Sequence, residues 1–129
     1  MISEKDSKKT VLVVEDDKFV LKAYRAKFQQ AGLEVWLATS VKEAEVFLER
    51  EPPGVIVLDL LLPGQDGFEF LSMVRSKVAW QKVPVLVLTN LGQAHHLDRA
   101  KKIGVTEYII KADVNINDLV EKVKKYAFS

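Results

Sequence analysis

Four short runs of apolar residues constrain the fold of this chain more than any other feature. Three of them consist only of valine, leucine and isoleucine: residues 11–14, 55–58 and 85–88. The fourth, residues 107–110, is more broken and places Glu-Tyr before two isoleucines. Continuous apolar runs of this kind are typical of parallel strands that are buried on both faces. The sequence therefore predicts a parallel sheet at the centre of the fold.

Segments with helical periodicity alternate with these runs. The first contains an apolar stripe made of Val20, Ala23, Tyr24 and Phe28, and Gly32 then terminates it. Periodicity and capping residues predict four further helices: residues 40–48, one that starts near Asp66, residues 94–103, and one that follows Asn115. Residues 33–38 alternate as a strand near a sheet edge does. Five strand–helix repeats predict an α/β, doubly wound, five-stranded parallel sheet with five helices on its two faces.

Composition places the chain among ordinary globular domains. Its 129 residues suffice for one domain with a buried core, which we expect over residues 10–127 after a disordered lead-in of residues 1–9. The formal net charge of +1 gives no field that would attract nucleic acid or a membrane, so neither is an expected partner. The absence of cysteine excludes disulfides and thiol catalysis. The first residues lack the hydrophobic centre of a secretory signal, and we expect a cytoplasmic location.

A residue able to take part in phosphoryl chemistry follows each apolar run. In chain order these residues are Glu15-Asp16-Asp17, Asp59, Thr89 and Lys111. The ligand crevice of an open parallel sheet lies at the carboxyl ends of its strands, so these side chains are expected along one rim. The first and third strands of a doubly wound sheet are neighbours. Asp59 is therefore expected beside Glu15 and Asp16.

This set of side chains suits the binding of a divalent cation and a phosphoryl group. Crowded carboxylates repel one another unless a proton or a cation intervenes. Hard oxygen ligands without histidine or cysteine nearby favour Mg²⁺. Asp59 is then a candidate nucleophile that forms an aspartyl phosphate. Lys111 and Thr89 are candidates for a cation and a hydroxyl donor at the phosphoryl oxygens.

Each of these residues also has a purely structural interpretation. Asp16 or Asp17 can cap the following helix, and Asp59 can belong to the turn that precedes Pro63. A threonine at a strand end often makes a local cap, and a lysine there is usually solvated. The functional interpretation is favoured because all of these residues follow strands at the same end, which the structural interpretations do not require.

With these residues in place, the chain resembles the receiver domains of response regulators in two-component signalling. The resemblance extends from Thr10 to Tyr126. It rests on four motifs in order: residues 13–17 (VVEDD), 58–67 (LDLLLPGQDG), 88–89 (LT) and 109–111 (IIK). The resemblance implies a flavodoxin-like fold with strand order 2-1-3-4-5.

The resemblance also implies a role for each acidic residue. Asp59 would be the phosphoacceptor. Asp16, Asp59 and the backbone carbonyl of Leu61 would bind Mg²⁺ directly, while Glu15 would act on the metal through water. The cofactor implied is therefore Mg²⁺, held by oxygen ligands alone.

A switch and its partners follow from the same resemblance. Lys111 would pair with one phosphoryl oxygen, Thr89 would move to bind another, and Tyr108 would turn inward as Thr89 moves. The phosphodonor would be a histidine kinase or a histidine phosphotransfer protein. The last two helices and the fifth strand would contact a downstream protein or a second copy. Such a domain assists its own phosphorylation and autodephosphorylation as a switch or phosphorelay intermediate, and is not a turnover enzyme.

Two residues depart from the receiver pattern. Many receivers have proline after the lysine, often with a cis peptide bond, whereas this chain has Ala112. A cis bond before a residue other than proline costs about 2.5–4 kcal/mol, so Lys111–Ala112 is expected to be trans. The residue after the threonine is usually very small, whereas here it is Asn90. Asn90 either narrows the entrance to the site or hydrogen-bonds the phosphoryl group.

Three other classes remain open on the sequence alone. A haloacid-dehalogenase-type phosphatase also uses an aspartate and Mg²⁺, but usually has an acidic residue at the position held by Leu61. A flavodoxin-like FMN binder shares the topology, but Glu15-Asp16-Asp17 would repel its phosphate. A degenerate receiver that only binds partners is supported by Asn90 and Ala112 alone.

Overall fold

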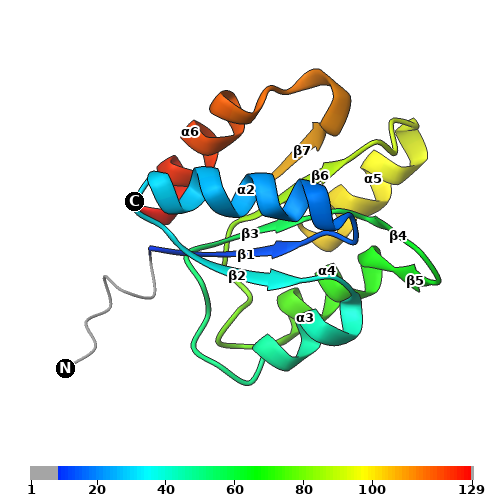
Figure 1. Cartoon of the computed structure of the whole chain (residues 1–129). Coiled ribbons are helices and arrows are strands. Elements are labelled where there is room, and N and C mark those ends of the chain that lie inside the picture. Colours follow the sequence, from blue (N-terminus) through cyan, green and yellow to red (C-terminus); the bar gives the residue numbers. More distant parts are fainter. Residues whose placement is uncertain (1–8, 129) are drawn as a thin grey trace.

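The computed structural model, which describes residues 9–128, is built around a central five-stranded sheet (Figure 1). The strands are β1 (Thr10–Val14), β2 (Glu34–Ala38), β3 (Val55–Leu58), β6 (Val85–Thr89) and β7 (Glu107–Ile110). All neighbouring strands are parallel, in the order β2-β1-β3-β6-β7. This order confirms the predicted 2-1-3-4-5 arrangement. The register pairs Val14 with Leu58, so β1 and β3 end level at the same rim.

Helices cover both faces of the sheet, as the sequence predicts. The helices α2 (Lys18–Gln30) and α6 (Ile116–Ala127) lie on one face, and α3 (Val41–Phe47), α4 (Gly67–Ser76) and α5 (Ala94–Ile103) lie on the other (Figure 1). Alternate residues of β1 divide between two cores, because side chains of a strand point to opposite faces. Val11 and Val13 pack with α2 and α6, and Leu12 and Val14 pack with the other three helices.

Side-chain caps start four of the helices close to the positions expected from the sequence. Asp17, Ser40, Asp66 and Asn115 each accept a backbone N–H from the first turn of α2, α3, α4 and α6, respectively. Such caps satisfy N–H groups that have no partner within the helix. They fix where the chain leaves the rim of the sheet and enters each helix.

The apolar stripe of the first helix differs from the prediction at one position. Ala23 is exposed, and Leu21 is buried in its place. Leu21 and Phe28 are seven residues apart, which is two helical turns, so they share the face that contacts the sheet. Phe28 was predicted correctly, and Ala23 was assigned to the wrong side of the stripe.

Two short elements were not predicted from periodicity. β4 (Leu61–Leu62) and β5 (Gln65–Asp66) form an antiparallel hairpin that begins two residues after Asp59. The 3₁₀ turn η1 (Lys111–Asp113) follows β7. Two or three residues are too few to show a repeating pattern.

The lead-in predicted for residues 1–9 lies outside the described residues except for Lys9, whose carbonyl accepts the N–H of Glu34 at 3.0 Å. In the part of the chain that the structure covers, no helix is long and apolar enough to cross a membrane.

Candidate functional site

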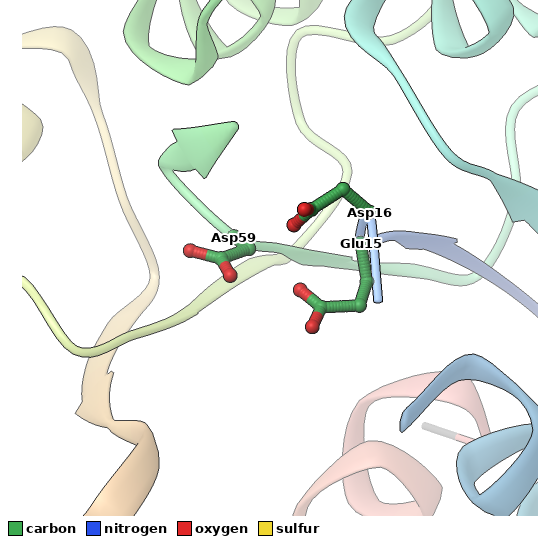
Figure 2. Close-up of side chains that lie close together, drawn as sticks. All are labelled: Glu15, Asp16 and Asp59. Atoms are coloured by element: carbon green, nitrogen blue, oxygen red, sulfur yellow. The ribbon is translucent and has the colours of Figure 1, made fainter. Parts of the chain in front are cut away.

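Three carboxylates meet where β1 and β3 end. Glu15 and Asp16 directly follow β1, and Asp59 directly follows β3. One carboxylate oxygen from each lies within 4.8 Å of the others, and Figure 2 shows the three side chains grouped around one space. Glu15 is 3% exposed and Asp59 6% exposed, whereas Asp16 is exposed. The structure therefore brings together the acidic residues that the sequence predicted.

Lys111 reaches this cluster from the end of β7. Its Nζ lies 2.9 Å from Oδ2 of Asp59 and 2.9 Å from Oε1 of Glu15. The ammonium group thus bridges the two buried carboxylates and offsets part of their mutual repulsion. Lys111 is separated from Glu15 by 96 positions in the sequence, so this pair depends entirely on the sheet order.

Close packing holds the backbone around Asp59. Its Oδ1 accepts the N–H of Leu61 at 2.9 Å. A Cβ atom at Gly67 would lie 2.7 Å from the Cα of Leu60 and 3.0 Å from the carbonyl oxygen of Asp59. Only glycine allows the start of α4 to come this close. The hydrogen bond from Leu61 and the close approach of Gly67 therefore both restrict the position of Asp59.

The cluster opens into a cavity of about 360 Å³. Its lining residues are Glu15, Asp16, Asp17, Asp59, Leu61, Pro63, Asn90 and Lys111. The buried carboxylate of Asp59 is therefore accessible from this side. Sequence reasoning missed the contribution of Pro63, although its place in the loop after Asp59 was the available signal.

A larger hollow of about 630 Å³ lies between α3 and the β4–β5 hairpin, away from this cluster.

Asp16 and Asp17 divide the two roles that the sequence left open for them. Asp17 caps α2, because its Oδ1 accepts the N–H groups of Phe19 at 2.9 Å and Val20 at 3.2 Å. Asp16 makes no such cap and contributes to the acidic cluster instead. The capping interpretation is therefore correct for Asp17, and the ligand interpretation fits Asp16.

Burial raises the pKa of the Glu15 carboxyl group to about 7. A hydrogen bond with Asp59 acts in the same direction, and Lys111 opposes it. For Asp59, burial also acts to raise the pKa, but hydrogen bonds from Glu15, Lys111, Leu61 and Thr89 lower it below the usual value. The pKa of Lys111 is raised, because its bonds to both carboxylates outweigh its own burial. Hydrogen bonds thus favour the charged form of Asp59, whereas burial favours the neutral form of Glu15.

The two switch candidates lie beside this pocket. Thr89 is fully buried at the end of β6, and its hydroxyl accepts the N–H of Leu91 at 3.4 Å. Tyr108 on β7 is partly buried, and its hydroxyl donates to the carbonyl of Leu91. Both side chains therefore contact the loop that follows β6. Thr89 contributes to the surroundings of Asp59 but does not line the cavity itself.

The titration of Glu15 predicts that stability falls as pH rises in metal-free buffer. Its pKa is 4.5 in the unfolded reference and about 7 in the folded protein, so the folded protein binds more protons between these values. The resulting stability is complete below pH 4.5, is lost as pH rises through 7, and amounts to about 3 kcal/mol. Urea unfolding midpoints, measured in EDTA from roughly pH 5 to pH 8, test this fall in stability. Glu15→Gln should flatten the curve; an equal slope in both proteins would contradict it.

The donor set fits a divalent cation such as Mg²⁺. All three grouped ligands are carboxylates, and hard cations prefer oxygen ligands. Asp16 is exposed at the cavity, which leaves room for the water molecules that Mg²⁺ usually retains. The residues present are therefore compatible with the metal that the sequence predicted.

The sheet order and the acidic rim together define an α/β protein with an acidic pocket at the carboxyl ends of its strands, whose oxygen ligands suit a divalent cation. The family described as response regulator receiver domain matches residues 11–124, and the chain belongs to this family. It is therefore a receiver domain, the phosphorylation switch of two-component signalling. The class predicted from the four motifs is confirmed.

Curated relatives differ in how much of their length this chain covers. An uncharacterized 14.6 kDa protein of Leptolyngbya boryana is 31% identical over 92% of this chain and 90% of its own length. Sporulation initiation phosphotransferase F of Bacillus subtilis is 27% identical over 90% of this chain and 91% of its own length. The phosphate regulon transcriptional regulatory protein PhoB of Rhizobium meliloti is 28% identical over 88% of this chain but only 50% of its own length.

Solved receiver structures agree with the fold. A CheY-like response regulator receiver domain of Methanospirillum hungatei superposes with a TM-score of 0.83 at 25% identity, covering 92% of each chain. The Mn²⁺-bound form of response regulator Rcp1 superposes with a TM-score of 0.75 at 26% identity, covering 90% of this chain and 89% of that one. A divalent cation is thus bound in a protein of this fold.

Proposed function

We propose that Asp59 accepts a phosphoryl group from a phosphohistidine donor. A carboxylate oxygen of Asp59 attacks phosphorus, the bond between phosphorus and the donor imidazole breaks, and the imidazole leaves. The observation that carries this proposal is the position of Asp59: its charged carboxylate lines an open cavity and is bonded to Lys111 at 2.9 Å. The phosphorylated domain is proposed to span residues 10–127.

Asp16, Asp59 and the Leu61 backbone carbonyl are the proposed ligands of Mg²⁺, and Glu15 acts on it through water. When bound, Mg²⁺ neutralises the carboxylates and gives the pocket affinity for phosphoryl oxygens. Asp16 is exposed and lies in the same ligand group as Glu15 and Asp59. This arrangement supports Asp16 as the ligand that meets the cation first from solvent.

Lys111 and Thr89 are proposed to bind the phosphoryl oxygens. Phosphoryl transfer needs mainly positioning and charge stabilisation, and Lys111 already has its ammonium group at Asp59. Thr89 must move its buried hydroxyl toward the new group. Because Tyr108 and Thr89 both bond to Leu91, this movement is proposed to release Tyr108 and turn it inward.

The proposed partners rest on family membership. The phosphodonor is a histidine kinase or a histidine phosphotransfer protein, and the protein acts in the cytoplasm. Output is proposed to pass through α5, α6 and β7 to a downstream protein or a second copy. The domain assists its own phosphorylation and autodephosphorylation and does not turn over a separate substrate.

Incubation with acetyl phosphate and Mg²⁺ tests the function. Intact-mass spectrometry should show one acid-labile phosphoryl group on the protein. The same incubation with EDTA should show little or none, because the carboxylates then repel the phosphodonor. No uptake under either condition, from a protein with a cooperative melting transition, would contradict the proposed function.

Mg²⁺ alone should raise the melting temperature by binding the folded state. At ten times the dissociation constant the gain is about 1.4 kcal/mol, or roughly 4 °C for a domain of this size. Asp16→Asn should lose most of this shift. Asp17→Asn is the matched control, because asparagine also caps helices well. Equal shifts in the two variants would remove Asp16 from the metal site.

A further inference from the structure

The loop after β6 and the turn after β7 are joined by one side chain. Oδ1 of Asn90 accepts the backbone N–H of Ala112 at 3.1 Å, although the two residues lie 22 positions apart. Asn90 directly follows Thr89, and Ala112 directly follows Lys111. The hydrogen bond therefore connects the two segments that carry the proposed phosphoryl-binding groups.

This bond acts on the backbone next to Lys111. The N–H of Ala112 and the carbonyl of Lys111 belong to one planar peptide group, so fixing the N–H orients the Cα of Lys111. Lys111 is the first residue of η1, whose N-terminus has no side-chain cap. Short 3₁₀ turns have poor internal hydrogen bonds. Asn90 thus supplies an external bond to a turn that would otherwise be weakly held.

Asn90 and Ala112 are the two residues that depart from the receiver sequence pattern, and this hydrogen bond joins them. Proline at position 112 would have no N–H to donate, and it would disfavour a helical conformation at Lys111. Alanine allows η1 to begin at Lys111 and leaves a donor, which Asn90 accepts. The peptide bonds of the described residues include no cis bond, so the trans expectation for Lys111–Ala112 is confirmed.

We propose that Asn90 is a positioning residue for Lys111 and acts through the amide of Ala112. Lys111 has a flexible four-carbon stem, and its Nζ lies 2.9 Å from Oδ2 of Asp59 and 2.9 Å from Oε1 of Glu15. The hydrogen bond between Asn90 and Ala112, here called the tether, fixes the backbone from which that stem extends. This inference rests on the proposed function of Asp59 and names the group that keeps its cation in place.

A double-mutant cycle on the phosphorylation rate tests the proposal. Rates with acetyl phosphate and Mg²⁺ are measured for the unmodified protein, Asn90→Ala, Lys111→Ala and the double variant. Loss of one hydrogen bond should slow Asn90→Ala roughly fivefold. In the Lys111→Ala background the same change should have almost no effect, because the group it positions is gone.

Two results in this cycle would overturn the proposal. An unchanged rate in Asn90→Ala would show that the tether does not position Lys111. An equal slowing in both backgrounds would show that Asn90 acts on the phosphoryl group directly. Failure of the proposed function gives a different result, because the unmodified protein then takes up no phosphoryl group at all. Failure of this inference alone leaves phosphorylation of the unmodified protein intact.

Amide exchange gives a second measurement on the metal-free protein. Asn90→Ala should accelerate hydrogen exchange at the Ala112 amide, followed by NMR. Asn115→Ala is the matched control, because it removes a similar side-chain bond, to the N–H of Asp118 at 2.8 Å. This control should leave both Ala112 exchange and the phosphorylation rate unchanged. Unaltered Ala112 exchange in Asn90→Ala would also overturn the proposal.

Discussion

Asp59→Asn should abolish phosphorylation. An amide cannot act as the nucleophile that forms an aspartyl phosphate, and asparagine also removes one of the three carboxylates grouped around the cavity. The expected result is no added phosphoryl group in the intact-mass spectrum after incubation with acetyl phosphate and Mg²⁺. The unmodified protein should gain one group under the same conditions.

The fold should survive this substitution. Asparagine has nearly the shape of aspartate, and its side-chain oxygen can still accept the N–H of Leu61 that now bonds to Asp59. Removing one charge also relieves the repulsion with Glu15. A cooperative melting transition therefore accompanies the loss of labelling. Asp98→Asn on α5 serves as the matched control and should be labelled normally. Equal labelling of the Asp59 and Asp98 variants would show that another residue is the acceptor.

The site was largely predictable because its residues follow strands whose pattern is strong. Each of β1, β3 and β6 is fully buried along its length, so its continuous apolar run identified both the strand and the residue at its end. Parallel pairing then places those ends together. Asp16, Asp59 and Thr89 were found in this way, whereas Lys111 follows β7, whose apolar run is more broken and only partly buried. Their distances follow from sheet order, which the motifs supplied.

The Asn90–Ala112 bond could not be predicted in the same way. It joins a side chain to a backbone N–H across two loops, and loops carry no period from which to infer their contacts. Asn90 and Ala112 each differ from the usual receiver pattern, but the sequence gives no sign that they contact each other. Neither of the effects expected of Asn90, a narrowed entrance or a bond to the phosphoryl group, included a contact with Ala112.

The role of each residue within a motif also could not be predicted from the hydrophobic pattern. Asp16 and Asp17 are adjacent and both suit a helix cap, so only the backbone path decides which of them faces the cavity. Asp17 adopts extended dihedral angles and becomes the cap of α2.

The position held by Leu61 carries a 57% exposed apolar side chain, which cannot act as the general acid of a dehalogenase-type phosphatase.

Lys111→Ala should slow phosphorylation far more than it weakens Mg²⁺ binding. Removal of one preorganised donor to a developing charge typically lowers the rate by about 10²–10³-fold, and Lys111 is the cation bonded to Asp59. Its loss also removes a positive charge from the pocket, so the affinity for Mg²⁺ should be maintained or increased. Phosphorylation rates by intact mass and Mg²⁺ affinity by thermal shift measure the two effects separately.

Two other variants show whether geometry or charge matters at this position. Lys111→Arg keeps the charge but replaces a compact ammonium group with a planar guanidinium, so it should recover only part of the rate. Lys122→Ala removes a lysine that is also 2.9 Å from a carboxylate, Glu107, but lies away from the cavity. It should leave the rate unchanged. If Lys111→Ala lowered Mg²⁺ affinity more than the rate, Lys111 would belong to the support of the metal site and not to the phosphoryl site.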